Sequence, residues 1–156
     1  MRIVLTCGGI IRQGPERELL DDYIRRANLL AQNHGFPRVH ENEIDLQREK
    51  TRADETQKLF SGLSDRTKRI ILDERGESLS TRAMATQLDI MREDRWTGIY
   101  FVIGGADGLD HSRIDSRDKL WCLGRATWPH KLLRIMLAEQ VYRIYSIWAG
   151  TPYHRS

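Results

Sequence analysis

The chain reads Ile99-Tyr100-Phe101-Val102-Ile103-Gly104-Gly105-Ala106-Asp107-Gly108 at its most informative stretch, where a run of β-branched and aromatic residues stops at three glycines. Five apolar residues without a helical period indicate a strand buried on both faces, as in the centre of a parallel α/β sheet. Glycine lets a ligand approach bare main chain, and open α/β sheets bind ligands at the carboxyl edge of their strands. We therefore expect a ligand pocket at residues 104–108, with a simple tight turn as the alternative.

The composition favours one globular domain over residues 1–156, with 40% hydrophobic and 30% charged residues. The net charge of +3 is compatible with a nucleic-acid partner but does not require one. The sequence opens without a secretory leader pattern, and charged residues interrupt the apolar stretch 132–148, so we expect a cytoplasmic protein with no membrane partner. The two cysteines, Cys7 and Cys122, lack the spacing of a zinc site, and we expect no metal.

Strand-like and helix-like segments alternate along the chain. The strand candidates are 2–7, 38–46, 69–73, 99–103 and 120–123. The helix candidates run from Pro15 to the break at Gly35, over 54–62, after Ser80 and over 131–148. This alternation predicts right-handed parallel crossovers, and hence an α/β fold with a mostly parallel sheet flanked by helices. Loops at 74–78, 104–108 and 124–130 are expected to follow three of the strands.

The last predicted helix, 131–148, has an unusual distribution of apolar residues. Its residues Glu139, Arg143 and Ser146 fall on one narrow stripe, and most of the remaining circumference is apolar. A chain of 156 residues has little interior in which to cover such a helix on all sides. We therefore expect the helix to pack on its own sheet and on a second copy of the chain, in a homodimer.

The C-terminal residues Pro152-Tyr153-His154-Arg155 concentrate groups that handle ligands. An arginine can bind phosphate with two hydrogen bonds, and an aromatic ring can stack on an unpaired base. A histidine can move a proton near neutral pH. The alternative is that Tyr153 only fixes the tail to its own domain.

Four separated motifs support a more specific interpretation. They are a strand ending in Gly104-Gly105-x-x-Gly108, a loop from Leu123 to Pro129-His130, a helix with Arg134 followed by Glu139-Gln140-x-Tyr142-Arg143, and the terminal Pro152-Tyr153-His154-Arg155. In this order, and together with Leu72-Asp73 and Gly76, the whole chain resembles the SPOUT-class ribosomal RNA large subunit methyltransferase H family. The resemblance implies an α/β fold with a C-terminal trefoil knot, a homodimer, and S-adenosyl-L-methionine (SAM) bound in the knot.

The resemblance also implies a substrate and a set of site residues. The family methylates N3 of a pseudouridine in 23S rRNA, and we expect the assembled ribosome to be the partner. The implied cofactor-binding positions are Leu72, Gly104, Gly105, Gly108, Leu123, Gly124, Arg125, Ala126, Thr127 and Trp128. The sequence departs from the family at Ala106, where proline is common, at Gly124-Arg125, where a small polar pair is usual, and at Ser156, where an acidic residue is common. None of these changes replaces a reacting group.

Methyl transfer from a sulfonium to nitrogen needs no metal, so the protein has to align the reacting atoms and handle the proton on N3. We expect His154 to handle this proton, Arg143 and Arg155 to stabilise charge or contact phosphate, and Tyr153 to position the base. Glu139 is an alternative base, although its spacing from Arg143 favours an ion pair. We expect both subunits to contribute groups to the substrate site. A nonenzymatic RNA-binding protein and a methyltransferase for another nucleotide are the competing interpretations.

Overall fold

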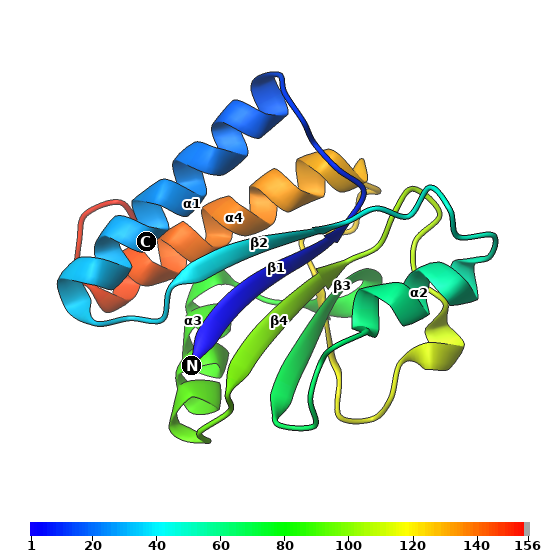
Figure 1. Cartoon of the computed structure of the whole chain (residues 1–156). Helices are drawn as coiled ribbons and strands as arrows, with labels where there is room; N and C mark the ends of the chain where they lie inside the picture. Colours follow the sequence, from blue (N-terminus) through cyan, green and yellow to red (C-terminus); the bar gives the residue numbers. More distant parts are fainter. Residues whose placement is uncertain (155–156) are drawn as a thin grey trace.

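A parallel sheet of five strands forms the centre of the computed structural model, which describes residues 1–154 (Figure 1). Arg155, one of the predicted site residues, lies outside the described residues. The strands are β1 (Arg2–Gly8), β2 (Val39–Ile44), β3 (Thr67–Ser78), β4 (Gly98–Ile103) and β5 (Lys119–Cys122). Their order across the sheet is β2-β1-β4-β3-β5, and every pair is parallel. The predicted α/β fold with a parallel sheet is confirmed.

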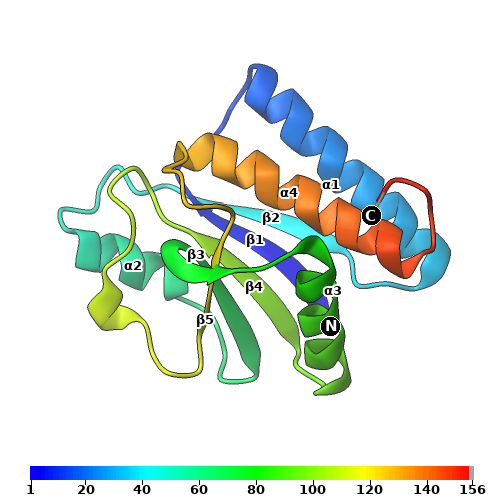
Figure 2. The same cartoon turned by 180° about the vertical axis from the view of Figure 1, so that it is seen from behind.

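Helices cover the two faces of the sheet unequally (Figures 1 and 2). The helices are α1 (Pro15–His34), α2 (Arg52–Phe60), α3 (Thr81–Glu93) and α4 (His130–Trp148), with a short 3-10 turn at His111–Arg113. The larger apolar core joins α1, α3 and α4 to one face, for example through Leu20, Leu88 and Val141. A smaller core on the opposite face joins Leu59 of α2 to Val102. Within residues 1–154, no helix is long and apolar enough to cross a membrane.

The strand predicted from residues 99–103 is the central strand of the sheet. It pairs with β1 on one edge and with β3 on the other, and all six residues of β4 are buried. Cys7 and Cys122 are free thiols buried beside this core. Burial raises the pKa of the Cys7 thiol to about 12, so this group stays protonated at neutral pH.

The segment 74–78 was expected to be a loop, and this prediction is wrong. Strand β3 continues to Ser78 through an irregularity in its pairing with β5, where both Leu72 and Glu77 pair with Trp121. The continuation is possible because Gly76 has no side chain: a Cβ there would lie 2.5 Å from the carbonyl carbon of Trp121. The second part of β3 therefore packs directly on the backbone of β5 (Figure 2). The trefoil knot that the resemblance implies stays a prediction.

Helix α4 is more deeply buried in its own chain than its sequence suggested. The expected polar stripe is wrong at Ser146, which is fully buried and donates a hydrogen bond from Oγ to the carbonyl of Arg143 at 2.7 Å. Arg134, on the same helix, is also fully buried. The apolar circumference packs mainly on α1, α3 and the sheet, and Leu132 keeps 41% of its surface exposed. The homodimer therefore stays a prediction.

The close contact at Gly76 predicts a specific cost for a side chain there. We expect Gly76→Ala to lower stability by about 3 kcal/mol, because its methyl group would overlap the backbone of β5. This corresponds to a fall of roughly 6–12 °C in Tm for a chain of this size. Thermal unfolding followed by circular dichroism measures the change.

Gly62→Ala is the matched control, because a Cβ at Gly62 meets no atom within 4 Å. Its cost is limited to the left-handed backbone at φ +76°, about 1–2 kcal/mol. Equal losses in Tm for the two variants would contradict the proposed overlap.

Candidate functional site

The carboxyl ends of β4 and β5 and the middle of β3, at 72–75, surround a cavity of about 690 Å³. This volume lies within the range of about 300–1,000 Å³ that is typical of small-molecule sites. All the predicted cofactor positions except Arg125 line it: Leu72, Gly104, Gly105, Gly108, Leu123, Gly124, Ala126, Thr127 and Trp128. Arg125 is exposed and does not line the cavity, so its inclusion is not supported by the geometry.

The glycines after β4 make a tight turn and also form part of the cavity wall. Gly108 donates its backbone N–H to the carbonyl of Gly105 at 3.1 Å and has a left-handed φ of +74°. A Cβ at Gly104 would lie 2.9 Å from the carbonyl carbon of Gly108. The motif therefore forms the tight turn and also exposes main chain to a cavity, and the binding of a ligand there stays a prediction.

The loop 123–128 is folded on itself beside this turn. Trp128 donates its indole N–H to the carbonyl of Leu123 at 3.2 Å, and Cys122 Sγ lies 2.6 Å from the carbonyl oxygen of Gly124. Gly124 has a left-handed φ of +106°. These contacts close the loop while the side chain of Trp128 remains 39% exposed. The loop thus offers an apolar and aromatic wall opposite the glycine turn.

Asp73 and His111 are cavity residues that the sequence analysis missed. The Nε2 atom of His111 lies 2.9 Å from Oδ2 of Asp73, and both residues line the cavity. Asp73 Oδ1 accepts the backbone N–H of Arg75 at 2.9 Å. Asp73 could have been found from its position at the end of the predicted strand 69–73, whereas no local sequence pattern marked His111. Together they place a carboxylate and an imidazole in the wall of a cavity that Glu74 and Asp107 also line.

His130 lines the same cavity at the N-terminus of α4. Burial, together with the positive charges of Arg134 and Lys131, lowers the pKa of this imidazole. His130 is therefore neutral at physiological pH and presents an uncharged polar ring to a ligand. The sequence analysis named it only at the end of the motif loop that begins at Leu123 and did not place it among the cofactor positions.

A second cavity of about 780 Å³ lies on the other side of the segment 122–124, which lines both. Residues of α1, of the start of α3, of α4 and of the tail surround it, including Tyr23, Met84, Ile135, Glu139 and His154. Its lining is mainly apolar apart from a few polar side chains. The predicted proton-handling residue His154 therefore lies in this second cavity and not in the first.

The tail and α4 form a polar cluster next to the second cavity. The predicted ion pair of Glu139 and Arg143 is confirmed, with Arg143 Nε donating to Glu139 Oε1 at 2.9 Å. Tyr153 donates its hydroxyl to the same carboxylate oxygen at 3.1 Å, and the guanidinium of Arg143 lies 4.8 Å from the centre of the Tyr153 ring. Burial and the neighbouring Glu139 carboxylate raise the pKa of Tyr153, so it stays protonated.

Arg143 and Tyr153 of this cluster, and the nearby His154, lie away from the first cavity. Neither Arg143, Tyr153 nor His154 lines the glycine cavity of its own chain. Tyr153 is fixed to α4, with its ring centre 4.5 Å from that of Tyr142, as the structural alternative for the tail proposed. Among residues 1–154, no group forms a hydrogen bond with the buried Nδ1 of His154. One nitrogen of this imidazole is therefore unpaired within the part of the chain that the structure describes.

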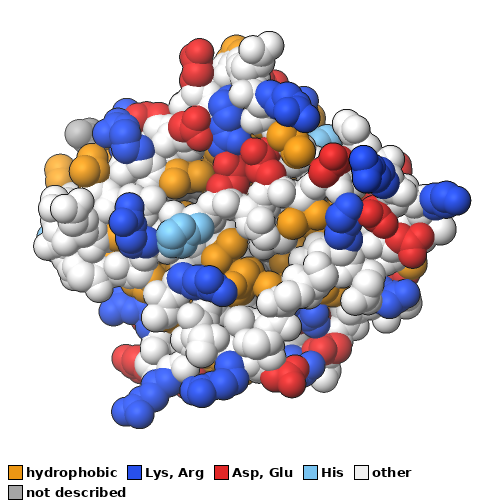
Figure 3. Space-filling model, in the orientation of Figure 1, with side chains coloured by type: hydrophobic (Ala, Val, Ile, Leu, Met, Phe, Trp, Pro, Cys, Tyr) orange, Lys and Arg blue, Asp and Glu red, His pale blue; other side chains and the backbone are white. Residues whose placement is uncertain are grey.

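Charged side chains do not mark a nucleic-acid surface on the face that carries the exposed edge of β2. Basic side chains are dispersed over that face, and acidic side chains lie among them (Figure 3). In the described part of the chain, no group of three or more His, Cys, Asp or Glu residues is placed to hold a metal ion.

The parallel sheet and the glycine-lined cavity at its carboxyl edge define an α/β protein with a cavity of the size that small-molecule sites have. A family model described as "Predicted SPOUT methyltransferase" matches residues 1–154. The chain belongs to this family and is a methyltransferase.

Curated relatives agree over the full length of the chain. The ribosomal RNA large subunit methyltransferase H of Maricaulis maris (strain MCS10) is 43% identical over 155 residues, which cover 99% of both chains. The proteins of the same name from Methylocella silvestris and Rhodopseudomonas palustris (strain TIE-1) are 40% and 39% identical, over 159 and 160 residues. These alignments cover 99% and 100% of both chains.

The lowered pKa of His130 predicts a pH-dependent stability. Between this pKa and the ordinary value of about 6.5, the unfolded state binds more protons than the folded state. The free energy of unfolding should therefore fall as the pH drops from 7.5 through 6.5, and His130→Gln should reduce that fall. Urea denaturation at a series of pH values measures it. His40→Gln is the control, because His40 is exposed. Identical pH profiles for His130→Gln and the wild type would contradict the lowered pKa of His130.

Proposed function

We propose that this methyltransferase transfers a methyl group from SAM to N3 of a pseudouridine in 23S rRNA. The observation that carries the proposal is the meeting of three separate chain segments, around Leu72, Gly104-Gly105 and 123–128, at one cavity. These segments are the motif positions of a family whose relatives, 39–43% identical, are named ribosomal RNA large subunit methyltransferase H. A ribosomal substrate also fits a cytoplasmic location.

The first cavity fits the chemistry of SAM. SAM has an apolar adenine face, hydrogen-bonding ribose and carboxylate groups, and positive charge on its sulfonium and ammonium groups. Leu72, Leu123 and Trp128 supply apolar walls, and the glycine turn exposes main-chain groups for hydrogen bonding. The carboxylate of Asp73, whose side chain is 11% exposed, can accept hydrogen bonds from a cationic group.

SAM supplies an already activated methyl group, so the chain's own residues have to orient the base and manage its proton. N3 of pseudouridine carries a proton that leaves before or during attack, and a cation lowers the cost of the negative charge that develops. His154 is the proposed proton acceptor, because its Nδ1 has no partner within residues 1–154. Arg143 is the proposed cation, and its ion pair with Glu139 fixes its orientation.

We propose that the site is completed by a second subunit of a homodimer. His154 faces the second cavity of its own chain, so a tail from the partner is needed at the glycine cavity. The mainly apolar second cavity, with Leu19, Tyr23, Ile135 and Met136 in its wall, is the surface that a second copy would cover. Substrate groups would then come from both subunits at each site.

Transfer of labelled methyl from SAM to ribosomes or rRNA lacking the modification tests the proposed reaction. We expect label in a single 23S pseudouridine with the wild type. Ala126→Trp, which fills the cavity from its wall, should reduce transfer at least about tenfold. Thr86→Trp is the size-matched control, because Thr86 is exposed on α3 and lines neither cavity.

The possible failures of this experiment separate the competing functions. SAM binding without label in any 23S pseudouridine would contradict the substrate and favour another nucleotide. Absence of SAM binding by the folded protein would contradict the reaction and favour a nonenzymatic RNA-binding protein.

Mixing two inactive variants tests the shared site. A dimer of one Ala126→Trp chain and one His154→Ala chain keeps one intact site if cavity and tail come from different subunits. An equal mixture that exchanges subunits should then recover roughly a quarter of wild-type activity. A mixture of Ala126→Trp with the Ala126→Trp/His154→Ala double variant is the control and should stay inactive. Complete inactivity of the first mixture, with subunit exchange demonstrated, would argue for a site within one chain.

A further inference from the structure

Arg134 of α4 is a charged residue with no solvent exposure, and it lies in a network of charged groups behind the glycine cavity. We propose that Arg134 is a positioning residue for the cofactor site: it fixes the glycine segments of two neighbouring strands relative to α4. The inference deepens the proposed function and rests on it, since SAM is the ligand whose binding the network would favour.

The two terminal nitrogens of the Arg134 guanidinium bind two different kinds of acceptor. Nη1 donates to Glu41 Oε1 at 3.1 Å and to Glu43 Oε2 at 2.9 Å. Nη2 donates to the main-chain carbonyls of Gly8 and Gly9, at 3.1 and 2.9 Å. The planar fork of arginine can bind carboxylates and carbonyls at the same time, which the single ammonium of lysine cannot do with the same geometry. Arg134 thus connects β2 to the carboxyl end of β1.

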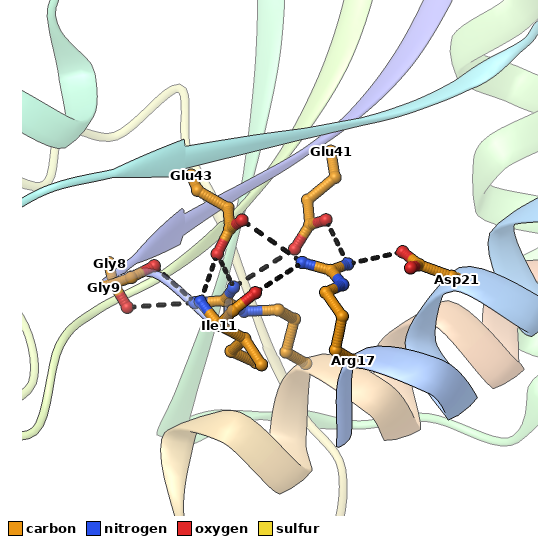
Figure 4. A network of polar contacts seen from close by, with 8 residues as sticks. Gly8, Gly9, Ile11, Arg17, Asp21, Glu41 and Glu43 are labelled. Atoms are coloured by element: carbon orange, nitrogen blue, oxygen red, sulfur yellow. Dashed lines mark hydrogen bonds and ion pairs between the residues drawn. The ribbon is translucent and has the colours of Figure 1, made fainter. Parts of the chain in front are cut away.

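Arg17 of α1 binds the same two carboxylates from the other side (Figure 4). Its Nη2 lies 2.5 Å from Glu41 Oε2 and 2.8 Å from Asp21 Oδ1, and its Nη1 donates to Glu43 Oε1 at 3.2 Å. Two cations therefore face the two glutamates, which are mostly buried, and Arg17 also pairs with Asp21, whose side chain is 63% exposed. Buried ion pairs provide little net stability compared with apolar packing, so the fixed geometry is the more informative property of this network.

The glycine segment that Arg134 binds lies directly against the glycine turn that lines the cavity. A Cβ at Gly8 would lie 2.7 Å from the backbone nitrogen of Gly105 and 3.1 Å from the carbonyl carbon of Gly104. No side chain therefore separates the end of β1 from the glycine turn after β4. A shift of the Gly8 carbonyl moves the backbone on which Gly104 and Gly105 rest, because close-packed groups have no free space to absorb it.

Arg134 also belongs to the element that forms the opposite wall. His130, one turn earlier on α4, and Leu133, next to Arg134, line the cavity. The same side chain consequently sets the distance between the start of α4 and the support of the glycine turn. Among residues 1–154, Arg17 forms no hydrogen bond with Gly8 or Gly9. It is joined to this region through the shared glutamates and through the carbonyl of Ile11, which accepts from its Nη1 at 3.2 Å.

This difference between the two arginines gives a matched experiment. Arg134→Lys and Arg17→Lys each weaken the same charge network, but only Arg134→Lys removes the paired contact to the two glycine carbonyls. We expect both variants to lose Tm, and Arg134→Lys alone to raise the Kd for SAM, by about tenfold or more in calorimetry. Its KM for SAM should rise in parallel, while its KM for the rRNA substrate stays within about twofold of the wild type.

Hydrogen exchange in the absence of SAM provides a readout that does not depend on the reaction. The amides of residues 104–108 should exchange faster in Arg134→Lys than in Arg17→Lys or the wild type. If Arg134→Lys does not fold, Glu43→Gln takes its place, because it keeps the shape of the side chain and weakens one contact of Arg134 Nη1. Glu43→Gln also weakens the contact of Arg17 Nη1, and Arg17→Lys is the control for that loss. Glu43→Gln should change exchange and Kd in the same direction.

Equal changes in SAM affinity for the two lysine variants, or unchanged exchange at residues 104–108, would overturn the positioning role and leave a structural ion network. A wild-type protein that does not bind SAM would contradict the proposed function instead. In that case the exchange comparison still decides whether Arg134 orders the glycine turn.

Discussion

The burial of β4 on both faces and along both edges is the constraint on which the site depends. Its six residues have no exposed surface to adjust, and β1 and β3 hold it in parallel register on either side. Every strand therefore ends at the same edge of the sheet. The cavity forms there because the chain leaves this edge of the sheet through glycines and loops, whereas both faces and both edges of β4 are closed by side chains and neighbouring strands.

Backbone packed directly on backbone is the second recurring feature, and it follows from that crowding. Gly8 rests against Gly104 and Gly105, the turn at 104–108 closes on itself, and Gly76 rests on β5. At Gly76 and Gly8 the backbone conformation is one that any residue can adopt, so the need for glycine comes from neighbouring atoms. The cavity wall is consequently made of main chain held at fixed distances, which suits a reaction that depends on alignment more than on a reacting side chain.

The central strand, the parallel sheet and the glycine turn at the cavity could be predicted from sequence because they depend on local patterns: an apolar run, glycines at strand ends and helical periodicity. The other cavity positions, Leu72 and 123–128, were implied by the family resemblance. The errors arise where distant segments meet. Segment 74–78 looks like a polar loop until β5 lies beneath Gly76, and Ser146 looks like a surface residue until α1 and α3 cover α4. Arg134 reads as an interruption of an apolar helix, and its partners Glu41 and Glu43 lie more than ninety positions earlier in the chain. Spacing along the sequence cannot reveal that pairing.

The segment 122–124 lies between the two cavities. Its position limits which residues could take part both in methyl transfer and in removal of the proton from the same base. The glycine cavity lies on one side of this wall, and His154 with the Glu139–Arg143 pair lies on the other. Reacting groups must approach within hydrogen-bond or bond-forming distance, so an imidazole behind the wall cannot serve the cavity in front of it. Tyr153, fixed to α4 through Glu139 and Tyr142, prevents the tail of the same chain from crossing freely. A tail held so firmly beside an apolar cavity is well placed to be presented to another chain, since its polar groups are already oriented before any substrate binds.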